Sequence, residues 1–141
     1  DQADHVGARY TLALAYARLE LEEQLEALEA SYHHRSNAWF ALARIILLYK
    51  LDRMSAARRA LQGFMRAYEA GSFLLIKPIY VELYLPIRPS FDRGSFEEVA
   101  MACSEAEPIL MDTPDLITWA QEHDDFVNQA KNFAHDNGFE W

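Results

Sequence analysis

The chain has 141 residues, of which 51% are apolar and 13% aromatic, and its formal net charge at neutral pH is −9. This length and composition predict one globular domain over residues 1–141, with enough apolar side chains for a buried core. The acidic balance disfavours nucleic acid as a partner, because proteins that bind nucleic acid need a basic surface.

The sequence contains no segment that indicates a membrane or an oxidising compartment. No apolar run reaches the about 20 residues that cross a bilayer, so no membrane partner is expected. The start, Asp1–His5, lacks the basic and apolar regions of a signal peptide. The single cysteine, Cys103, excludes an internal disulfide and is typical of a reducing cytoplasm. We therefore expect a cytoplasmic protein.

The charge is unevenly distributed along the chain. Residues 37–70 carry six basic and two acidic side chains, a net charge of +4. The segments before and after this stretch carry net charges of −4 and −9. The basic stretch is either a surface for an acidic partner or the solvated side of a helix.

The first half of the chain has the pattern of consecutive helices. Between Ala8 and Ala70 there is no proline and one glycine, Gly63. Apolar residues recur there every three or four positions, which is helical periodicity. Ser55 is a candidate N-cap, and Gly71 is a candidate C-terminal stop. The helices are expected at 7–19, 22–31, 38–50 and 56–69.

The second half begins with an ambiguous segment. Residues 80–85 favour a strand by propensity, but an isolated strand has no partner in a helical domain, so a short helix is expected within 73–85. Ser95 is a candidate cap for the next helix. Pro114 occupies the first turn of the last helix, where proline is tolerated, and Gly138 ends that helix. These two helices are expected at 96–106 and 114–137.

Two segments thirty positions apart are similar. Ala8–Ala13 (ARYTLA) aligns with Ala38–Ala43 (AWFALA), and each is followed by a second amphipathic helix. An amphipathic hairpin cannot bury its apolar face alone, so such units stack. Small residues allow close approach of the paired helices, and Ala57 and Ala60 are expected to face Ala43. The pattern predicts two adjacent hairpins, at about 7–32 and 38–70, followed by C-terminal helices over 73–137.

The second hairpin resembles a tetratricopeptide repeat (TPR). Trp39–Ala43 is similar to the W-x-x-L-G/A opening of that repeat, and Leu51–Ala57 is similar to its turn and the alanine of its second helix. The segment departs from the pattern in having Asp52 where glycine is usual. Asp4–Tyr10 resembles the D-N-x-G-x-R-Y start of a bacterial TPR subgroup, and Gly94–Ala100 resembles the later G-[SD]-x-E-E-A helix of that subgroup.

The resemblance implies an all-α fold in which antiparallel helix hairpins stack as a short α-solenoid with a C-terminal capping helix. In such a fold the first helix of each pair lines a concave binding face. Transferred to this sequence, that face comprises Tyr10, Leu14, Arg18, Asn37, Phe40, Arg44 and Leu47. The alternative is that Tyr10, Phe40 and Leu47 are core residues under the C-terminal helix.

Candidate catalytic and metal-binding residues are few. His33 and His34 are adjacent and point in different directions, and zinc needs three or four ligands. His123 precedes two aspartates but has the spacing of a packed side chain beside Trp119. Cys103 is close in sequence to acids, which raise the pKa of a thiol and disfavour a nucleophile. We therefore expect no catalytic residue, no metal and no cofactor.

Two functions remain as hypotheses. The first is a non-catalytic interaction module that binds a peptide or protein segment on the concave face, or that self-associates. The alternative is an acidic inhibitor or immunity-type protein that blocks a basic partner by charge mimicry, and it is motivated by the acidic C-terminal half of the chain. Affinity that falls steeply with ionic strength would favour charge mimicry.

Overall fold

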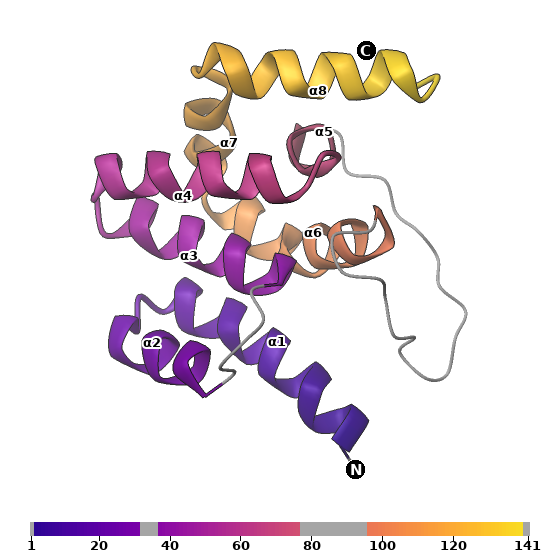
Figure 1. Ribbon diagram of the computed structural model, residues 1–141. Helices are drawn as coiled ribbons and strands as arrows, with labels where there is room; N and C mark the ends of the chain where they lie inside the picture. The colour runs from indigo at the N-terminus through magenta and orange to yellow at the C-terminus, as the bar shows by residue number, and fades with distance from the viewer. Residues whose placement is uncertain (1, 32–36, 77–95, 140–141) are drawn as a thin grey trace.

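The computed structural model describes residues 2–31, 37–76 and 96–139, and in these residues every regular element is an α-helix (Figure 1). The prediction of an all-α fold is confirmed. In chain order the helices are α1 (Gln2–Arg18), α2 (Glu22–Ala30), α3 (Ala38–Lys50), α4 (Met54–Ala67), α5 (Gly71–Ile76), α6 (Phe96–Asp112), α7 (Pro114–Gln121) and α8 (Asp124–Asp136).

Helix α3 is the centre of the molecule. It packs against α1, α4 and α6, and α1 also packs against α2. In Figure 1, α3 and α4 lie side by side, with the α1–α2 hairpin below them and α8 above them. Helix α5 lies between α4 and α8, and α7 connects α6 to α8. Helices α1 and α3, which begin the two hairpins, therefore pack against each other.

The turns of the two hairpins are built in the same way. Glu20 and Asp52, 32 positions apart, both have a φ of 59°, in the left-handed region that non-glycine residues rarely adopt. In each turn the next residue donates a backbone hydrogen bond of 2.9 Å to the carbonyl five positions earlier, from Leu21 to Tyr16 and from Arg53 to Leu48. Asp52 thus has the backbone conformation that glycine favours. The turns repeat at 32 positions rather than the 30 of the alanine alignment.

Several helix boundaries differ from the expectation. Helix α1 begins at Gln2 and α4 at Met54, earlier than predicted. Gly71 starts α5 instead of terminating α4, and residues 77–95, which include the ambiguous segment 80–85, lie outside the described residues. Helix α6 continues through Pro108 to Asp112; proline there removes one hydrogen bond but is exposed and does not end the helix.

The predicted last helix is two helices. The amides of Glu122 and His123 each donate a 3.1 Å hydrogen bond to the carbonyl three positions earlier, so the last turn of α7 tightens and α8 starts at Asp124 in a new direction (Figure 1). Helix α8 packs along α5 and α4. Residues 121–125 are polar and include no proline or glycine, the residues that most often mark the end of a helix. The sequence therefore does not indicate this break.

The core is a continuous cluster of buried residues from α1 to α8. Helix α3 contributes two of its largest side chains, Trp39 and Phe40, which are 1% and 2% exposed. Ala43 and Ala57 are fully buried between the paired helices, whereas Ala60 is half-buried. Small side chains at these positions let α3 and α4 approach closely, in agreement with the sequence analysis.

Within the described parts of the chain, no helix has both the length and the apolarity needed to cross a bilayer.

Candidate functional site

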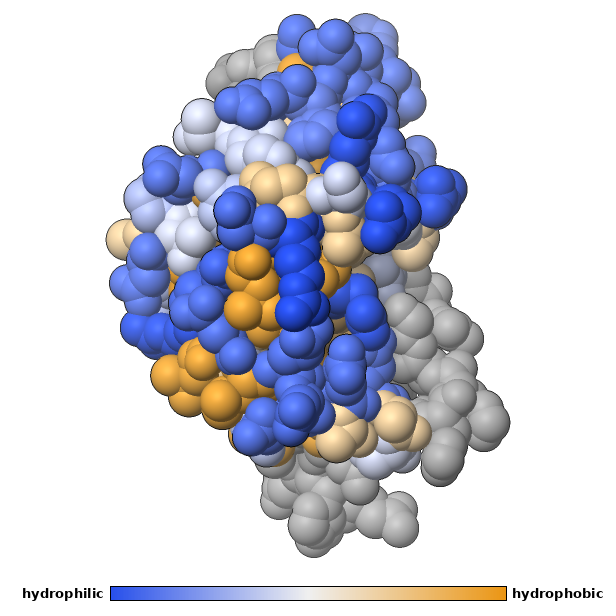
Figure 2. All heavy atoms as spheres, turned by 90° about the vertical axis from the view of Figure 1, so that its left-hand side faces the viewer, coloured by the Kyte–Doolittle hydropathy of each residue, from blue (hydrophilic) through white to orange (hydrophobic). Residues whose placement is uncertain are grey.

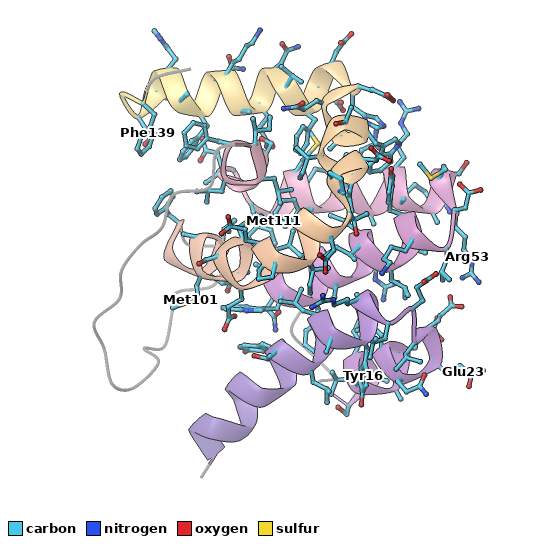
Figure 3. All side chains as sticks on the ribbon, turned by 180° about the vertical axis from the view of Figure 1, so that it is seen from behind. Tyr16, Glu23, Arg53, Met101, Met111 and Phe139 are labelled. Atoms are coloured by element: carbon cyan, nitrogen blue, oxygen red, sulfur yellow. The ribbon has the colours of Figure 1, made fainter. Side chains whose placement is uncertain are left out.

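Helix α6 covers the face that α1 and α3 form together. Seen from behind in Figure 3, α6, on which Met101 and Met111 are labelled, lies across α3. The buried carboxylate of Glu98 accepts a hydrogen bond of 3.2 Å from the amide of Ala38. Further along, Glu105 accepts a hydrogen bond from the indole of Trp39. At the C-terminal end Asp112 pairs with Arg18. The predicted concave face is therefore occupied by a helix of the same chain.

Three of the predicted binding residues are core residues. Leu14, Phe40 and Leu47 are 3%, 2% and 4% exposed, and Leu14 and Leu47 line none of the hollows described below. For Phe40 and Leu47 the burial agrees with the alternative that these residues belong to the core. Sequence periodicity identifies an apolar face but does not reveal which segment covers it.

Asn37 and Tyr10 have structural contacts. Asn37 is buried and caps α3, because its Oδ1 accepts a hydrogen bond of 3.0 Å from the amide of Phe40. Among the described residues its Nδ2 is the one buried side-chain nitrogen or oxygen without a hydrogen-bond partner. The ring of Tyr10 is half-buried and stacks on Trp39 with 4.6 Å between the centroids.

The two predicted arginines are exposed, and each pairs with a carboxylate of another helix. Arg18 pairs with Asp112 of α6, and Arg44 pairs with Glu29 of α2. Of these two arginines, Arg44 borders a hollow. The structure therefore places Phe40 and Arg44 together at one site and leaves the other five predicted residues outside it.

The site that contains Phe40 and Arg44 is a hollow of about 230 Å³ between the two hairpins, named here the inter-hairpin groove. Its floor is apolar and contains the buried rings of Phe40 and Phe64. The ion pair between Arg44 and Glu29 forms one edge. The complete lining is Glu29, Phe40, Ala41, Arg44, Ala60, Gly63, Phe64, Ala67 and Tyr68.

Gly63 lines the groove on the side of α4. A Cβ placed on this residue meets no neighbouring atom within 4 Å among the described residues. Glycine in the middle of a helix costs about 1 kcal/mol relative to alanine, and no close packing here offsets that cost. The glycine was visible in the sequence, but its role depends on the space beside it, which the sequence does not show.

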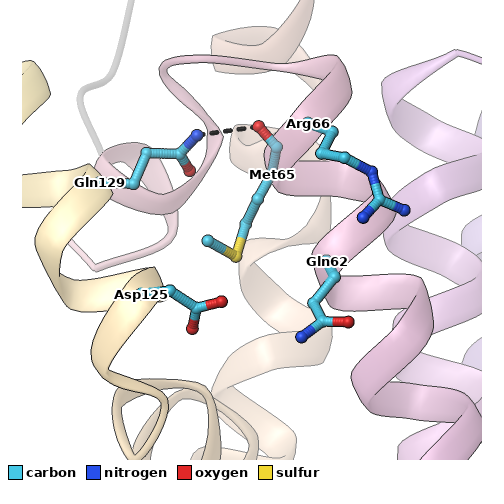
Figure 4. A pocket seen from close by; sticks show the side chains of 5 residues that line it. All are labelled: Gln62, Met65, Arg66, Asp125 and Gln129. Carbon is cyan, nitrogen blue, oxygen red and sulfur yellow. Dashed lines mark hydrogen bonds between the residues drawn. The ribbon is translucent and has the colours of Figure 1, made fainter.

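A second, more polar hollow of about 310 Å³ lies between α4 and α8 (Figure 4). Gln129 spans its inner end, where its amide nitrogen donates a hydrogen bond of 2.8 Å to the carbonyl of Met65 and its oxygen accepts one of 2.8 Å from Ser72. Both polar ends of that side chain are therefore used by the fold. Gln62, Arg66 and Asp125 line the remainder.

A third hollow, of about 210 Å³, lies between α5, α6 and α7 and is mainly apolar. Cys103 is part of its wall, and burial raises the pKa of this thiol to about 12. A thiol that stays protonated at neutral pH is a poor nucleophile. Met111, at the rim, is 71% exposed.

The acidic edge of α2 is partly neutralised within the molecule. Glu22 pairs with Arg53, and Glu29 pairs with Arg44, so the two carboxylates seven positions apart hold hairpin one against hairpin two. The hydrogen bond from Arg53 to Glu22 raises the pKa of the arginine. Glu23 and Glu26 remain exposed. Figure 2 shows one side of the molecule, where hydrophilic residues surround small separate patches of apolar residues.

The remaining candidates are the possible metal ligands and His123, and where the structure describes them their contacts are those of packed side chains. In residues 2–31, 37–76 and 96–139 no three histidine, cysteine or acidic side chains gather as a metal site; His33 and His34 lie outside these ranges. The Nδ1 of His123 lies 3.1 Å from the carbonyl oxygen of Trp119, and the two rings meet edge to face. His123 therefore packs against α7, and its Nδ1 faces backbone carbonyls.

Comparisons with protein-family models, with curated proteins and with solved structures found no match for this chain.

Proposed function

We propose that the chain is a non-catalytic protein-interaction module of the TPR type that binds a peptide or protein segment in the inter-hairpin groove. The observation that carries the proposal is a hollow with a mainly apolar lining between two helix hairpins, beside a helical glycine whose added Cβ would meet no atom of the described residues within 4 Å. Binding sites combine apolar floors with a few polar groups at the edge, which is the composition of this groove.

The hairpin turns support the TPR part of the proposal. Glu20 and Asp52 have the same left-handed conformation, and the hydrogen bonds around them are equivalent. Their spacing of 32 positions is close to the about 34 of the repeat. Asp52, which departs from the glycine of the motif, has the conformation that glycine favours in such a turn. Both hairpins therefore share one local design, as repeat units do.

In this proposal the binding surface is the inter-hairpin groove, whereas the sequence-based prediction placed it on the concave face. Helix α6 occupies the concave face, where Glu98 and Glu105 accept hydrogen bonds from the amide of Ala38 and the indole of Trp39 at the start of α3. The inter-hairpin groove lies on the side of α2 and α4, and it includes Phe40 and Arg44 of the predicted set. A partner can enter this groove without displacing any described helix.

A display experiment tests the proposal. The wild-type protein is used to select binders from a library of random peptides, and each binder is then measured against Gly63→Phe and Gly63→Ala. We expect Gly63→Phe to abolish binding because the ring fills the groove, and Gly63→Ala to retain it. Urea unfolding of both variants checks the fold. If every selected peptide binds Gly63→Phe as well as wild type, the groove is not the binding site.

The alternative, an acidic inhibitor that blocks a basic partner by charge mimicry, is motivated by the acidic C-terminal half, residues 71–141, whose net charge is −9. Glu23 and Glu26, the exposed glutamates on the acidic edge of α2, add to the acidic surface. Two of the four glutamates on that edge already pair with arginines of hairpin two, which weakens the case. Under this alternative a basic protein or peptide binds, the affinity falls steeply with salt, and the double change Glu23→Lys with Glu26→Lys removes the binding. Gly63→Phe leaves such binding unchanged.

A further inference from the structure

We infer that the hollow between α4 and α8 binds a small zwitterion of the α-amino acid class, with the carboxylate of the ligand on Arg66 and its ammonium group on Asp125. This site is separate from the inter-hairpin groove, because the two hollows share no lining residue. The basis of the inference is a pair of opposite charges that line one hollow without pairing with each other.

The two charged residues come from different helices. Arg66 is in the last turn of α4, Asp125 is in the first turn of α8, and both line the hollow. In Figure 4 the carboxylate of Asp125 points from α8 toward the side of α4, where Met65 separates it from Arg66. The hollow therefore has a wall with a positive group and a wall with a negative group.

Both charged groups are available to a ligand. The two side chains are exposed, and in the described part of the chain neither takes part in an ion pair. One carboxylate oxygen of Asp125 accepts a hydrogen bond of 2.9 Å from the amide of Phe126, which leaves the other oxygen for a ligand. An exposed arginine side chain has several staggered rotamers. A carboxylate in the hollow can therefore recruit the guanidinium of Arg66 through two parallel hydrogen bonds.

The charges of the two helices favour a ligand that carries both signs. Helix α4 contains three arginines and no acid, whereas α8 begins with Asp124 and Asp125. A simple anion is attracted by α4 and repelled by the start of α8, and a simple cation experiences the reverse. A zwitterion is attracted by both walls when its carboxylate faces α4 and its ammonium group faces α8. The electrostatics thus select for a zwitterion and also orient it.

The rest of the lining sets the size of the ligand. The volume of about 310 Å³ is at the lower end of the range of small-molecule sites, about 300–1,000 Å³. Gln129 is held at the inner end by its hydrogen bonds to Met65 and Ser72. The Met65 side chain offers an adaptable apolar surface, and Gln62 is half-buried with an amide that no other described residue uses. These contacts suit a free amino acid better than a larger molecule.

Free amino acids and their singly charged analogues test the inference. The common α-amino acids are screened at millimolar concentration by the thermal shift of the wild-type protein, since a ligand that binds the folded state raises its melting temperature. The tightest ligand is then compared by titration calorimetry with two analogues, which for leucine are isocaproate, without the amino group, and isoamylamine, without the carboxyl group. We expect each analogue to bind about tenfold or more weakly, because it lacks one charge-assisted hydrogen bond.

Charge-neutralising variants assign the two ends of the ligand. Arg66→Gln is expected to weaken the amino acid and its carboxylic acid analogue about tenfold and to leave the amine analogue unchanged. Asp125→Asn is expected to give the reverse pattern. Arg59→Gln and Asp124→Asn are the matched controls, because both residues are exposed on the same helices and neither lines the hollow. Each control should lose less than about threefold in affinity, and urea unfolding confirms that each variant folds.

The outcomes distinguish this site from the groove. The inference is wrong if no amino acid binds, or if either variant weakens all three ligands equally, as a purely structural effect would. If no amino acid binds but the display-selected peptides lose affinity for Arg66→Gln and Asp125→Asn, the hollow contacts a protein segment instead. Gly63→Phe should leave amino acid binding unchanged, because Gly63 lies outside this hollow. The groove and the hollow are thereby tested independently.

Discussion

The indole Nε1 of Trp39 donates a hydrogen bond to the carboxylate of Glu105, which joins the first turn of α3 to the middle of α6. The Trp39 ring is 1% exposed, so its N–H has no access to bulk water and depends on this partner. A helix-to-helix bond of this kind holds α6 on the face that the sequence pattern predicts as a binding surface. Helix α6 therefore covers the concave side, and the inter-hairpin groove lies on another side of the two hairpins.

The coupling between Trp39 and Glu105 is measurable. Glu105→Ala leaves a buried N–H unpartnered, which costs about 1–3 kcal/mol of the free energy of unfolding. A double-mutant cycle with Trp39→Phe separates the shared hydrogen bond from the other contacts of each side chain. We expect a coupling energy of about 1 kcal/mol or more from urea unfolding, and a smaller loss for Glu105→Gln. A coupling near zero contradicts the role given to this pair.

The sequence predicts that Asn37 binds a partner. From its position in the structure we expect its substitution to lower the stability of the protein. Its Oδ1 accepts the hydrogen bond of 3.0 Å from Phe40 that caps α3. Asn37→Ala removes this cap and should lower the free energy of unfolding by about 0.5–2 kcal/mol. Asn37→Ser keeps an acceptor and should lose less, which circular dichroism during urea unfolding measures. Equal stability of the alanine and serine variants would show that the cap contributes nothing.

Substitution by alanine should raise the stability of the protein at Gly63 and lower it at Gly71. Gly63→Ala adds a methyl group in open space within α4 and should stabilise the protein by up to about 1 kcal/mol. Gly71→Ala places a Cβ 2.5 Å from the ring of Phe64, a buried side chain, and should destabilise it by about 1–3 kcal/mol. Thermal unfolding compares the two variants with wild type. A stabilised Gly71→Ala protein would show that the packing around Phe64 is looser than described.

Cys103 should be unreactive in the folded protein and should make stability depend on pH in the alkaline range. Burial raises the pKa of its thiol from 9.0 to about 12. Between these values the unfolded chain loses the thiol proton and the folded chain keeps it, so the free energy of unfolding falls as pH rises, by up to about 1.4 kcal/mol per pH unit. Below pH 9 this contribution to stability is fully present.

The variant Cys103→Ala is the control for this prediction. It lacks the thiol, so the difference in unfolding free energy between wild type and variant should shrink as pH rises from 9. The raised pKa of Tyr49, caused first by burial, affects both proteins and cancels in the difference. Iodoacetamide should alkylate the thiol only after unfolding. Rapid alkylation of the folded protein at neutral pH would contradict the burial of Cys103.

The helices of the first half follow from local sequence. Their apolar spacing, the cap Asn37 and the hairpin turns act within a few residues, so the elements α2 and α3 lie within two residues of their predicted bounds. The second half is less regular. Pro108 does not end α6, and α7 and α8 separate at His123 without proline or glycine, because packing on neighbouring helices outweighs weak local preferences.

What the sequence determined by itself is the all-helical composition and the absence of an evident catalytic motif, since both depend on residue types and short spacings. Only the tertiary structure decided that α6 covers the face of α1 and α3, and that Gly63 borders an open groove. The physical reason is that an amphipathic pattern shows that a face must be buried but not by which segment. Burial of Leu14 and Leu47 arises from contacts between residues far apart in the chain.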